Sequence, residues 1–219
     1  MKTFAPRIVN LPVAQRRLWP TLRPARDMGY VLYGGTAVSL QLGHRRSVDF
    51  DFLTAHPLDL ARLREAFGFS RVDEVLQQSR DTLVVLTKGV KLSFFCGLDF
   101  GRVGKPLLTN DGVMQVASLD DLMAHKLKVI PQRAEKKDYL DIAAMLVAGV
   151  ALDRGLAAAR LMFGRTFQPA ESLKALAWFK DGDLPSVQTA TRKLLIAAAA
   201  RVGDLPKVTI TSKSLASRG

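Results

Sequence analysis

The stretch that most constrains the fold is "YVLYGGTAVSLQLGHRRSVDFDFLT", residues 30–54. A short apolar run ends at a Gly-Gly turn, and good helix formers follow it until Gly43, a glycine that stops a helix. Residues 48–54 then alternate apolar and polar side chains, which is typical of a half-buried strand. The stretch therefore predicts a strand, a tight turn, a short helix and a second strand.

The rest of the chain adds strands and helices to this unit. Helical spacing of apolar residues over 60–67 predicts a covering helix, and "TLVVLTKGVKLSFFC" predicts a hairpin that turns at Lys88 and Gly89. One or two short helices are expected over 7–28, and a succession of helices over 118–202. We therefore predict an α+β fold, in which a mixed sheet covered by helices is followed by a helical C-terminal region.

Three parts are expected along the chain. Residues 1–117 form an α/β core with an N-terminal helical segment, and residues 118–206 form a helical region that completes a cleft with it. Residues 207–219 have too little apolar content to pack, so a flexible tail is expected there.

Composition narrows the class of protein. One cysteine in 219 residues cannot form an intrachain disulfide and fits a reducing compartment. The apolar runs are too short to cross a bilayer, and the N-terminus lacks a signal-peptide pattern, so we expect a cytoplasmic protein without membrane contact. The net charge of +12 favours anionic partners such as nucleic acid or nucleotides. The charge by itself could also reflect a solvent-exposed basic surface that has no anionic partner.

Asp49 and Asp51 share one face of the second predicted strand, because side chains two residues apart on a strand point the same way. Val48, Phe50 and Phe52 are expected on the opposite face, against the helices. Two carboxylates this close repel each other unless a cation lies between them. Mg²⁺ prefers carboxylate oxygens, completed by water and substrate phosphates. The pair therefore predicts half of a magnesium site for a nucleotide.

Gly34, Gly35 and Thr36 are the candidates for binding phosphate. Glycines let backbone N–H groups approach phosphate oxygens closely, and the helix N-terminus adds its partial positive charge. The Thr36 hydroxyl is a further donor. Taken alone, the two glycines could simply form a turn, and the two aspartates could simply lie on the solvent-exposed side of an edge strand. The two features in this order favour a phosphate cradle beside a metal pair.

A Gly-Gly-Thr turn, a short helix and then Asp-x-Asp resembles the signature of the DNA polymerase beta type nucleotidyltransferase superfamily. More narrowly, "LYGGTAVSLQLGHRRSVDFDFLT", "LMAHKLKVIPQR" and "KKDYLDIAAML" resemble the AbiEii-type nucleotidyltransferases, many of which are toxins of abortive-infection toxin–antitoxin systems. The resemblance implies a nucleotidyltransferase-like fold and Mg²⁺-dependent transfer of a nucleotidyl group from a nucleoside triphosphate to a hydroxyl acceptor. It also implies RNA, such as a tRNA end, as the acceptor and an antitoxin protein as a partner.

The resemblance gives roles to residues of the second and third motifs. Lys126 interrupts the apolar stripe of its predicted helix. The resemblance implies that it contacts phosphate. The alternative is that its stem is buried and its ammonium extends to solvent. Asp138 is drawn inward and needs a cation, and the resemblance implies an active-site position for it and for Arg133. The alternative for Asp138 is a structural role, because a carboxylate in the first turn stabilises a helix. Asp141 is a weaker candidate for the active site than Asp138.

The chain departs from the superfamily pattern where a third carboxylate often joins the metal pair on a later strand. Ser93 occupies that position, and serine is not a base; Asp99 lies just beyond the strand. Three alternatives stay open: Asp138 supplies the missing group, the substrate is activated in another way, or the protein is a non-catalytic nucleotide- or nucleic-acid-binding module of the same fold.

Two rival functions and the role of His44 are also left undecided by the sequence. An interaction protein whose partner covers the basic ends is one rival, and transfer to a small cationic molecule is another. His44 could either bind phosphate or simply belong to a basic loop. His56 and His125 lack partners at metal-ligand spacing, so a zinc site is not expected.

Overall fold

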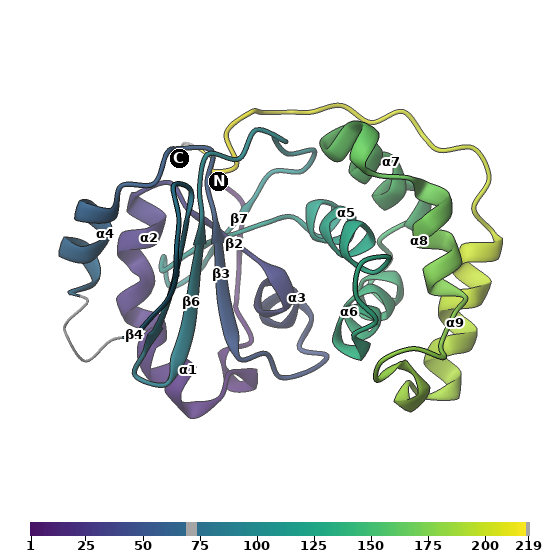
Figure 1. Cartoon of the computed structure of the whole chain (residues 1–219), viewed down its shortest axis with the longest axis horizontal. Coiled ribbons are helices and arrows are strands. Elements are labelled where there is room, and N and C mark those ends of the chain that lie inside the picture. The colour runs from purple at the N-terminus through teal and green to yellow at the C-terminus, as the bar shows by residue number, and fades with distance from the viewer. Residues whose placement is uncertain (69–73, 218–219) are drawn as a thin grey trace.

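A computed structural model describes residues 1–68 and 74–217, and within these residues an eight-stranded mixed sheet forms the centre of the molecule (Figure 1). The strands lie in the order β1-β7-β8-β2-β3-β6-β5-β4. Their bounds are β1 Thr3–Phe4, β2 Val31–Tyr33, β3 Asp49–Leu53, β4 Glu74–Gln78, β5 Thr82–Thr87, β6 Val90–Phe95, β7 Leu107–Thr109 and β8 Gln115–Val116. The α+β fold predicted from the sequence is confirmed.

Helices cover both sides of this sheet. In Figure 1, α2 and α4 lie on one side, whereas α3 lies on the other, between the sheet and the helices α5 to α9. The α-helices are α1 Val13–Leu18, α2 Arg23–Asp27, α3 Gly34–Leu42, α4 Leu60–Phe67, α5 Leu119–Val129, α6 Lys136–Val147, α7 Leu152–Phe163, α8 Pro169–Leu176 and α9 Thr189–Ala200. Short 3-10 helices are η1 Ile8–Asn10, η2 Trp19–Leu22, η3 Gly164–Thr166 and η4 Leu184–Ser186. None of the helices in the described ranges has the length and apolar character that a membrane span requires.

The central strand β3 pairs antiparallel with β2 and parallel with β6. Its apolar side is fully buried, and Phe52 stacks on Phe94 of β6 with ring centroids 5.0 Å apart. Val48, which the alternation placed on the same buried face, is instead exposed. The strand begins one residue later, at Asp49, so Val48 lies outside the ladder and does not reach the core.

The predicted hairpin between β5 and β6 is present, with Lys88 and Gly89 both at positive φ (49° and 74°). Two consecutive residues in this conformation form the turn whose twist matches that of a hairpin. In the helical region, α5 and α7 cross closely at Gly155, where an added Cβ would collide with the side chain of Met123. Ser118 caps α5, because its hydroxyl accepts a hydrogen bond from the Asp121 N–H (3.2 Å).

The segment after α9 runs back to the sheet and lies against it (Figure 1). The Arg102 N–H donates to the Ser212 carbonyl (2.9 Å), and the Thr211 N–H donates to the Arg102 carbonyl (2.8 Å). Leu215 is buried in the core. The sequence predicted a flexible tail over 207–219. The structure differs because backbone hydrogen bonds and one buried leucine hold its described part, and neither leaves a periodic signal in the sequence.

Candidate active site

The first turn of α3 and the strand β3 bring the glycine turn into contact with the aspartate pair. Tyr33, the last residue of β2, lies opposite Asp51 in the sheet, and the chain turns directly into α3 at Gly34. Gly34 has a φ of 71°, and a Cβ built on it would collide with Oδ2 of Asp51. Glycine is therefore required here both by the backbone conformation and by the carboxylate that lies against it.

Asp49 and Asp51 lie on one face of β3, and both are partly buried. Burial raises the pKa of the Asp51 carboxyl, and the neighbouring charge of Asp49 raises it further. Lys91, Lys126 and a hydrogen bond from Ser93 act in the opposite direction without overcoming this rise. The pair is thus costly to hold doubly ionised, and an added cation would relieve that cost. Two adjacent carboxylates beside a helix N-terminus form a donor set that fits Mg²⁺.

Lys91 of β6, which the sequence reading did not single out, is an immediate neighbour of this pair. Its ammonium lies 3.1 Å from Oδ2 of Asp49. The acids of the described ranges do not supply a third ligand, because no group of three or more His, Cys, Asp or Glu side chains there could hold a metal. The residues that fit Mg²⁺ are therefore Asp49 and Asp51.

The Thr36 hydroxyl differs from the donor that the sequence predicted, and Gly35 has a packing role that the sequence did not indicate. Thr36 is buried, and its hydroxyl donates to the backbone carbonyl of Asp49, so it ties α3 to β3. A Cβ on Gly35 would collide with Nη2 of Arg45, so this glycine makes room for the guanidinium. The groups left for an anion in this turn are the backbone N–H groups of the first turn of α3, which have no partner within the helix.

A buried ion network lies beside this turn, between α5 and α6. The Lys126 ammonium lies 2.7 Å from Oδ1 of Asp138 and 2.6 Å from Oδ2 of Asp141. Neither aspartate side chain is exposed to solvent, and Lys126 is itself buried. The predicted inward position of Asp138 and its need for a cation are both seen. Lys126, for which the resemblance implied a phosphate contact, holds two carboxylates.

Asp138 has a second cationic partner. The Arg133 Nε donates to Oδ2 at 2.8 Å and Nη2 donates to Oδ1 at 3.2 Å, while about half of the Arg133 side chain stays exposed. Burial acts to raise the pKa of Asp138, but the charge of Lys126 and the hydrogen bonds of Arg133 outweigh it, so the pKa is lowered. A carboxylate with a lowered pKa and two cations is a weak general base.

Asp141 is the most heavily bonded acid of the site, although the sequence ranked it below Asp138. Arg45 binds it through Nε (2.6 Å) and Nη2 (2.8 Å), and His44 contacts it through Nε2 (2.7 Å). Burial acts to raise the pKa of Asp141, but the hydrogen bond with His44, the charge of Lys126 and the bonds of Arg45 outweigh it. The pKa of Asp141 is therefore lowered well below its usual range. The available signal was its spacing of three from Asp138, which places both on one helix face.

His125 lies in an aromatic setting that the sequence did not indicate. Its ring centroid is 4.7 Å from that of Tyr33, 4.8 Å from that of Phe100 and 5.1 Å from that of Phe163. Burial, with a smaller effect from the charge of Lys126, lowers the pKa of His125 to about 3. The imidazole is therefore neutral at pH 7 and adds no positive charge to the site.

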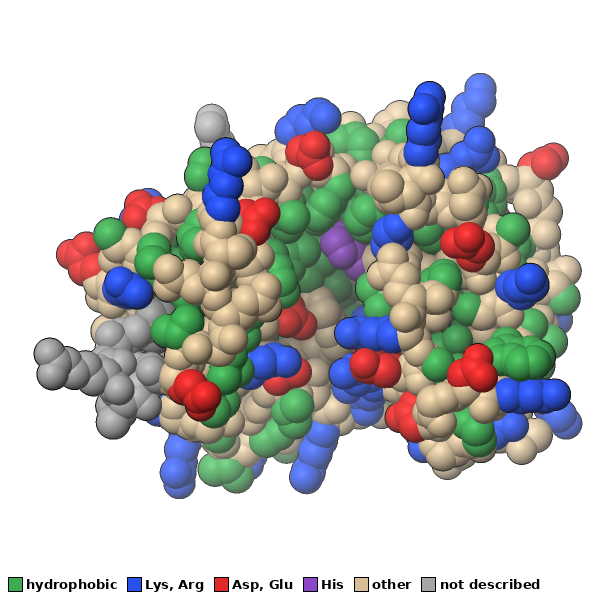
Figure 2. Space-filling view, in the orientation of Figure 1, with side chains coloured by type: hydrophobic (Ala, Val, Ile, Leu, Met, Phe, Trp, Pro, Cys, Tyr) green, Lys and Arg blue, Asp and Glu red, His purple; other side chains and the backbone are tan. Residues whose placement is uncertain are grey.

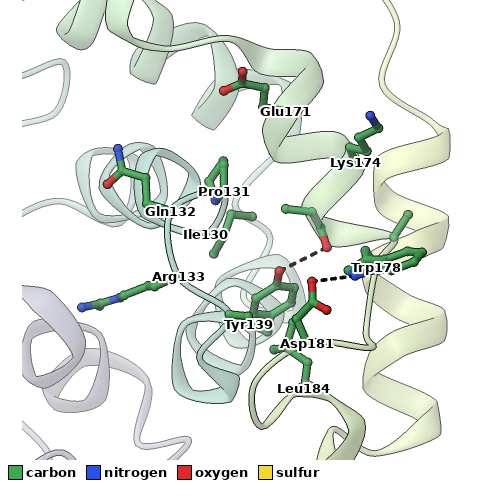
Figure 3. Close-up of a pocket in the computed structure, with 13 residues that line it drawn as sticks. Ile130, Pro131, Gln132, Arg133, Tyr139, Glu171, Lys174, Trp178, Asp181 and Leu184 are labelled. Carbon is green, nitrogen blue, oxygen red and sulfur yellow. Dashed lines mark hydrogen bonds between the residues drawn. The ribbon is translucent and has the colours of Figure 1, made fainter.

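The space-filling view shows a hollow between the sheet and the helical region, with charged side chains of both signs and a histidine on its walls (Figure 2). A pocket of about 900 Å³ also lies beside Arg133, between the end of α5, the start of α6, α8 and the segment that follows α8 (Figure 3). Trp178 lines this pocket with 48% of its surface exposed, and its Nε1 donates to Asp181 (2.8 Å). The Lys180 ammonium lies 5.0 Å from the centre of the indole ring.

A mixed sheet that carries an Asp-x-Asp strand beside a glycine turn, with helices around it, defines a nucleotidyltransferase-like fold. Residues 22–207 match the family described as "Nucleotidyl transferase AbiEii toxin, Type IV TA system", and the chain belongs to this family. It is also 39% identical over 116 residues to an uncharacterized protein of Aquifex aeolicus (strain VF5). That match covers 52% of this chain and 55% of the relative, so it spans little more than half the length of the relative.

Proposed function

We propose that this protein is a Mg²⁺-dependent nucleotidyltransferase that moves a nucleotidyl group from a nucleoside triphosphate to a hydroxyl of RNA. The observation that carries the proposal is the contact between Gly34 and the carboxylate of Asp51, with Asp49 on the same strand face. This contact joins a helix N-terminus suited to phosphates with a carboxylate pair suited to a cation. A nucleotide held by one is thereby within reach of the other.

The residues take distinct roles in this proposal. Asp49 and Asp51 hold Mg²⁺, which when bound neutralises phosphate charge and orients the reacting groups. The backbone of Gly34 and Gly35 binds phosphate oxygens. Arg133, half exposed at the edge of the ion network, stabilises charge that develops on the leaving pyrophosphate.

Lys126 and Asp138 support the site from behind in this proposal. Together with Asp141 and Arg45 they join α5 and α6 to the loop that follows α3. The charge of Lys126 also acts on Asp51, where it partly opposes the rise in pKa that burial causes. Thr36 holds the start of α3 against β3 through its bond to the Asp49 carbonyl.

RNA is favoured as the acceptor by two observations. The net charge of +12 suits a polyanion. The pocket beside Arg133 offers the exposed ring of Trp178, held by Asp181 and next to Lys180, and a base can stack on such a ring. We also propose that the protein acts in the cytoplasm and that an antitoxin protein restrains it, and the match to a toxin family supports this.

The experiment is transfer of label to RNA. Purified protein is incubated with each α-labelled nucleoside triphosphate, Mg²⁺ and total RNA, and the wild type is compared with Asp49→Asn and Asp51→Asn. Asp204→Asn is the matched control, because Asp204 is exposed after α9. Label in RNA with the wild type and the control, but with neither site variant, supports the proposal. Equal labelling by all four proteins contradicts it.

A non-catalytic module of the same fold is the second candidate, favoured by Ser93 and Lys91 at the positions of β6 opposite the pair. It predicts binding of a Mg²⁺–nucleotide complex that depends on Asp49 and Asp51, without label in RNA for any nucleotide. Equilibrium binding beside the labelling assay separates the two functions.

A further inference from the structure

The strand next to the carboxylate pair carries a positive charge on the face where a further acid would complete a two-metal site. In the parallel pairing of β3 and β6, Lys91 lies opposite Asp49 and Ser93 lies opposite Asp51. Residues opposite each other on neighbouring strands share a face of the sheet. The face that bears both aspartates thus receives an ammonium and a hydroxyl from β6.

We propose that Lys91 takes the place of a second divalent cation, so that the site binds a single metal ion together with the nucleotide. The inference rests on the proposed function and deepens it. The Lys91 ammonium lies 3.1 Å from Oδ2 of Asp49, with 39% of the lysine side chain and 33% of the aspartate side chain exposed. It also lies on the face of the sheet that carries both aspartates, because Lys91 is opposite Asp49 in the ladder. The carboxylate pair therefore already has one fixed cation in contact with it.

Counting formal charges favours one metal ion over two. Sites that hold two divalent ions use the ions to stabilise both the attacking and the leaving oxygen. With three carboxylates, two such ions leave a net charge of plus one. Here two carboxylates and Lys91 leave minus one, so a single divalent ion gives that same net charge. A second ion would bring the site to plus three and place two dications beside a fixed ammonium, which repels them.

The other acids near the site cannot complete a second metal site without breaking the ion network. Asp138 and Asp141 are buried, and each is bound by Lys126 and by an arginine. Within the described ranges the remaining His, Cys, Asp and Glu side chains add no third ligand to the pair. Lys91 is thus the residue that sets the number of metal ions.

The test counts Mn²⁺ ions bound to the full chain by electron paramagnetic resonance, with a nucleoside triphosphate analogue whose α–β bridge is a methylene group. We expect one Mn²⁺ per complex for the wild type and two for Lys91→Asp. Without nucleotide, Lys91→Ala removes the repelling charge and should tighten Mn²⁺ binding about fivefold. Lys88→Asn is the matched control, because it removes a lysine from the turn of the same hairpin and asparagine tolerates positive φ.

The possible results separate this inference from the proposed function. Two Mn²⁺ ions per complex in the wild type, or unchanged Mn²⁺ affinity in Lys91→Ala, overturns the role of Lys91 and leaves nucleotidyl transfer standing. A wild type that binds no Mn²⁺ with the analogue overturns both. Because Lys91→Asp places a third acid on the face and is the variant at risk of misfolding, Lys91→Ala gives an independent result.

Discussion

The ammonium of Lys126 lies 2.7 Å from Oδ1 of Asp138, and both side chains are buried. A buried ion pair contributes little net stability over an apolar pair, but removal of one partner leaves an uncompensated charge. Lys126→Met should therefore lower the free energy of unfolding by about 3–5 kcal/mol. Urea unfolding at pH 7 measures this change. Lys137→Met, whose half-exposed lysine pairs with Glu135, should cost less than about 1 kcal/mol, and an equal loss in both variants would contradict the buried network.

Gly34→Ala should abolish binding of the Mg²⁺–nucleotide complex, because the new Cβ collides with the Asp51 carboxylate and displaces it. Gly68→Ala is the matched control. Gly68 also has a positive φ, but a Cβ there meets nothing within 4 Å. Both variants should lose about 1 kcal/mol of stability from backbone strain, and only Gly34→Ala should lose the ligand in calorimetric titration. Similar nucleotide affinity in the two variants would count against the contact.

The ion network makes stability depend on pH in acid. The pKa of Asp141 is lowered in the folded protein from an ordinary value of 3.8, through His44, Lys126 and Arg45. A lowered carboxyl pKa gives stability that is fully present above the unfolded value and is lost as the pH falls below it, through the folded pKa. Asp141→Asn should thus be much less stable than the wild type at pH 7, and this difference should shrink steadily below pH 4. Chemical unfolding from pH 7 to pH 2.5 follows it, and a difference that stays constant contradicts the prediction.

Trp178→Ala should weaken binding of a single-stranded oligoribonucleotide, because stacking of a base on an aromatic ring is worth about 1–3 kcal/mol. The expected loss is about 5- to 150-fold in Kd, and Trp178→Phe should retain most of the affinity. Fluorescence anisotropy of a labelled oligonucleotide measures it. Leu161→Ala, at an exposed apolar residue of α7, is the control. Unchanged affinity in Trp178→Ala would remove the pocket from the acceptor site.

The sequence predicted the centre of the fold well, because strong local signals coincide there. The Gly-Gly turn, the alternation over 48–54 and the hairpin at Lys88 and Gly89 each have a defined backbone geometry. Strands β1, β7 and β8 have two or three residues each, too few for a periodic pattern, and their pairing comes from distant parts of the chain.

Single residues of the candidate site could be picked out from the sequence, but the contacts between them could not. Residue type identified Lys126 and Asp138 as unusual on apolar helix faces, yet the sequence could not say that they bind each other. Arg45 and Lys91 reach their partners across 96 and 42 residues of chain, respectively, and only the fold brings them together. A surface lysine on a strand gives no sequence signal of its own.

The return of the chain from α9 to Arg102 means that the helical region is tethered to the sheet at two separate places. One tether is the passage from β8 into α5, and the other is the hydrogen-bonded segment that ends with Leu215 in the core. The buried contact between Arg45 and Asp141 joins the same two parts of the molecule at a further place. Loss of the returning segment would therefore leave the helical region held to the sheet by the β8–α5 passage and by that ion network.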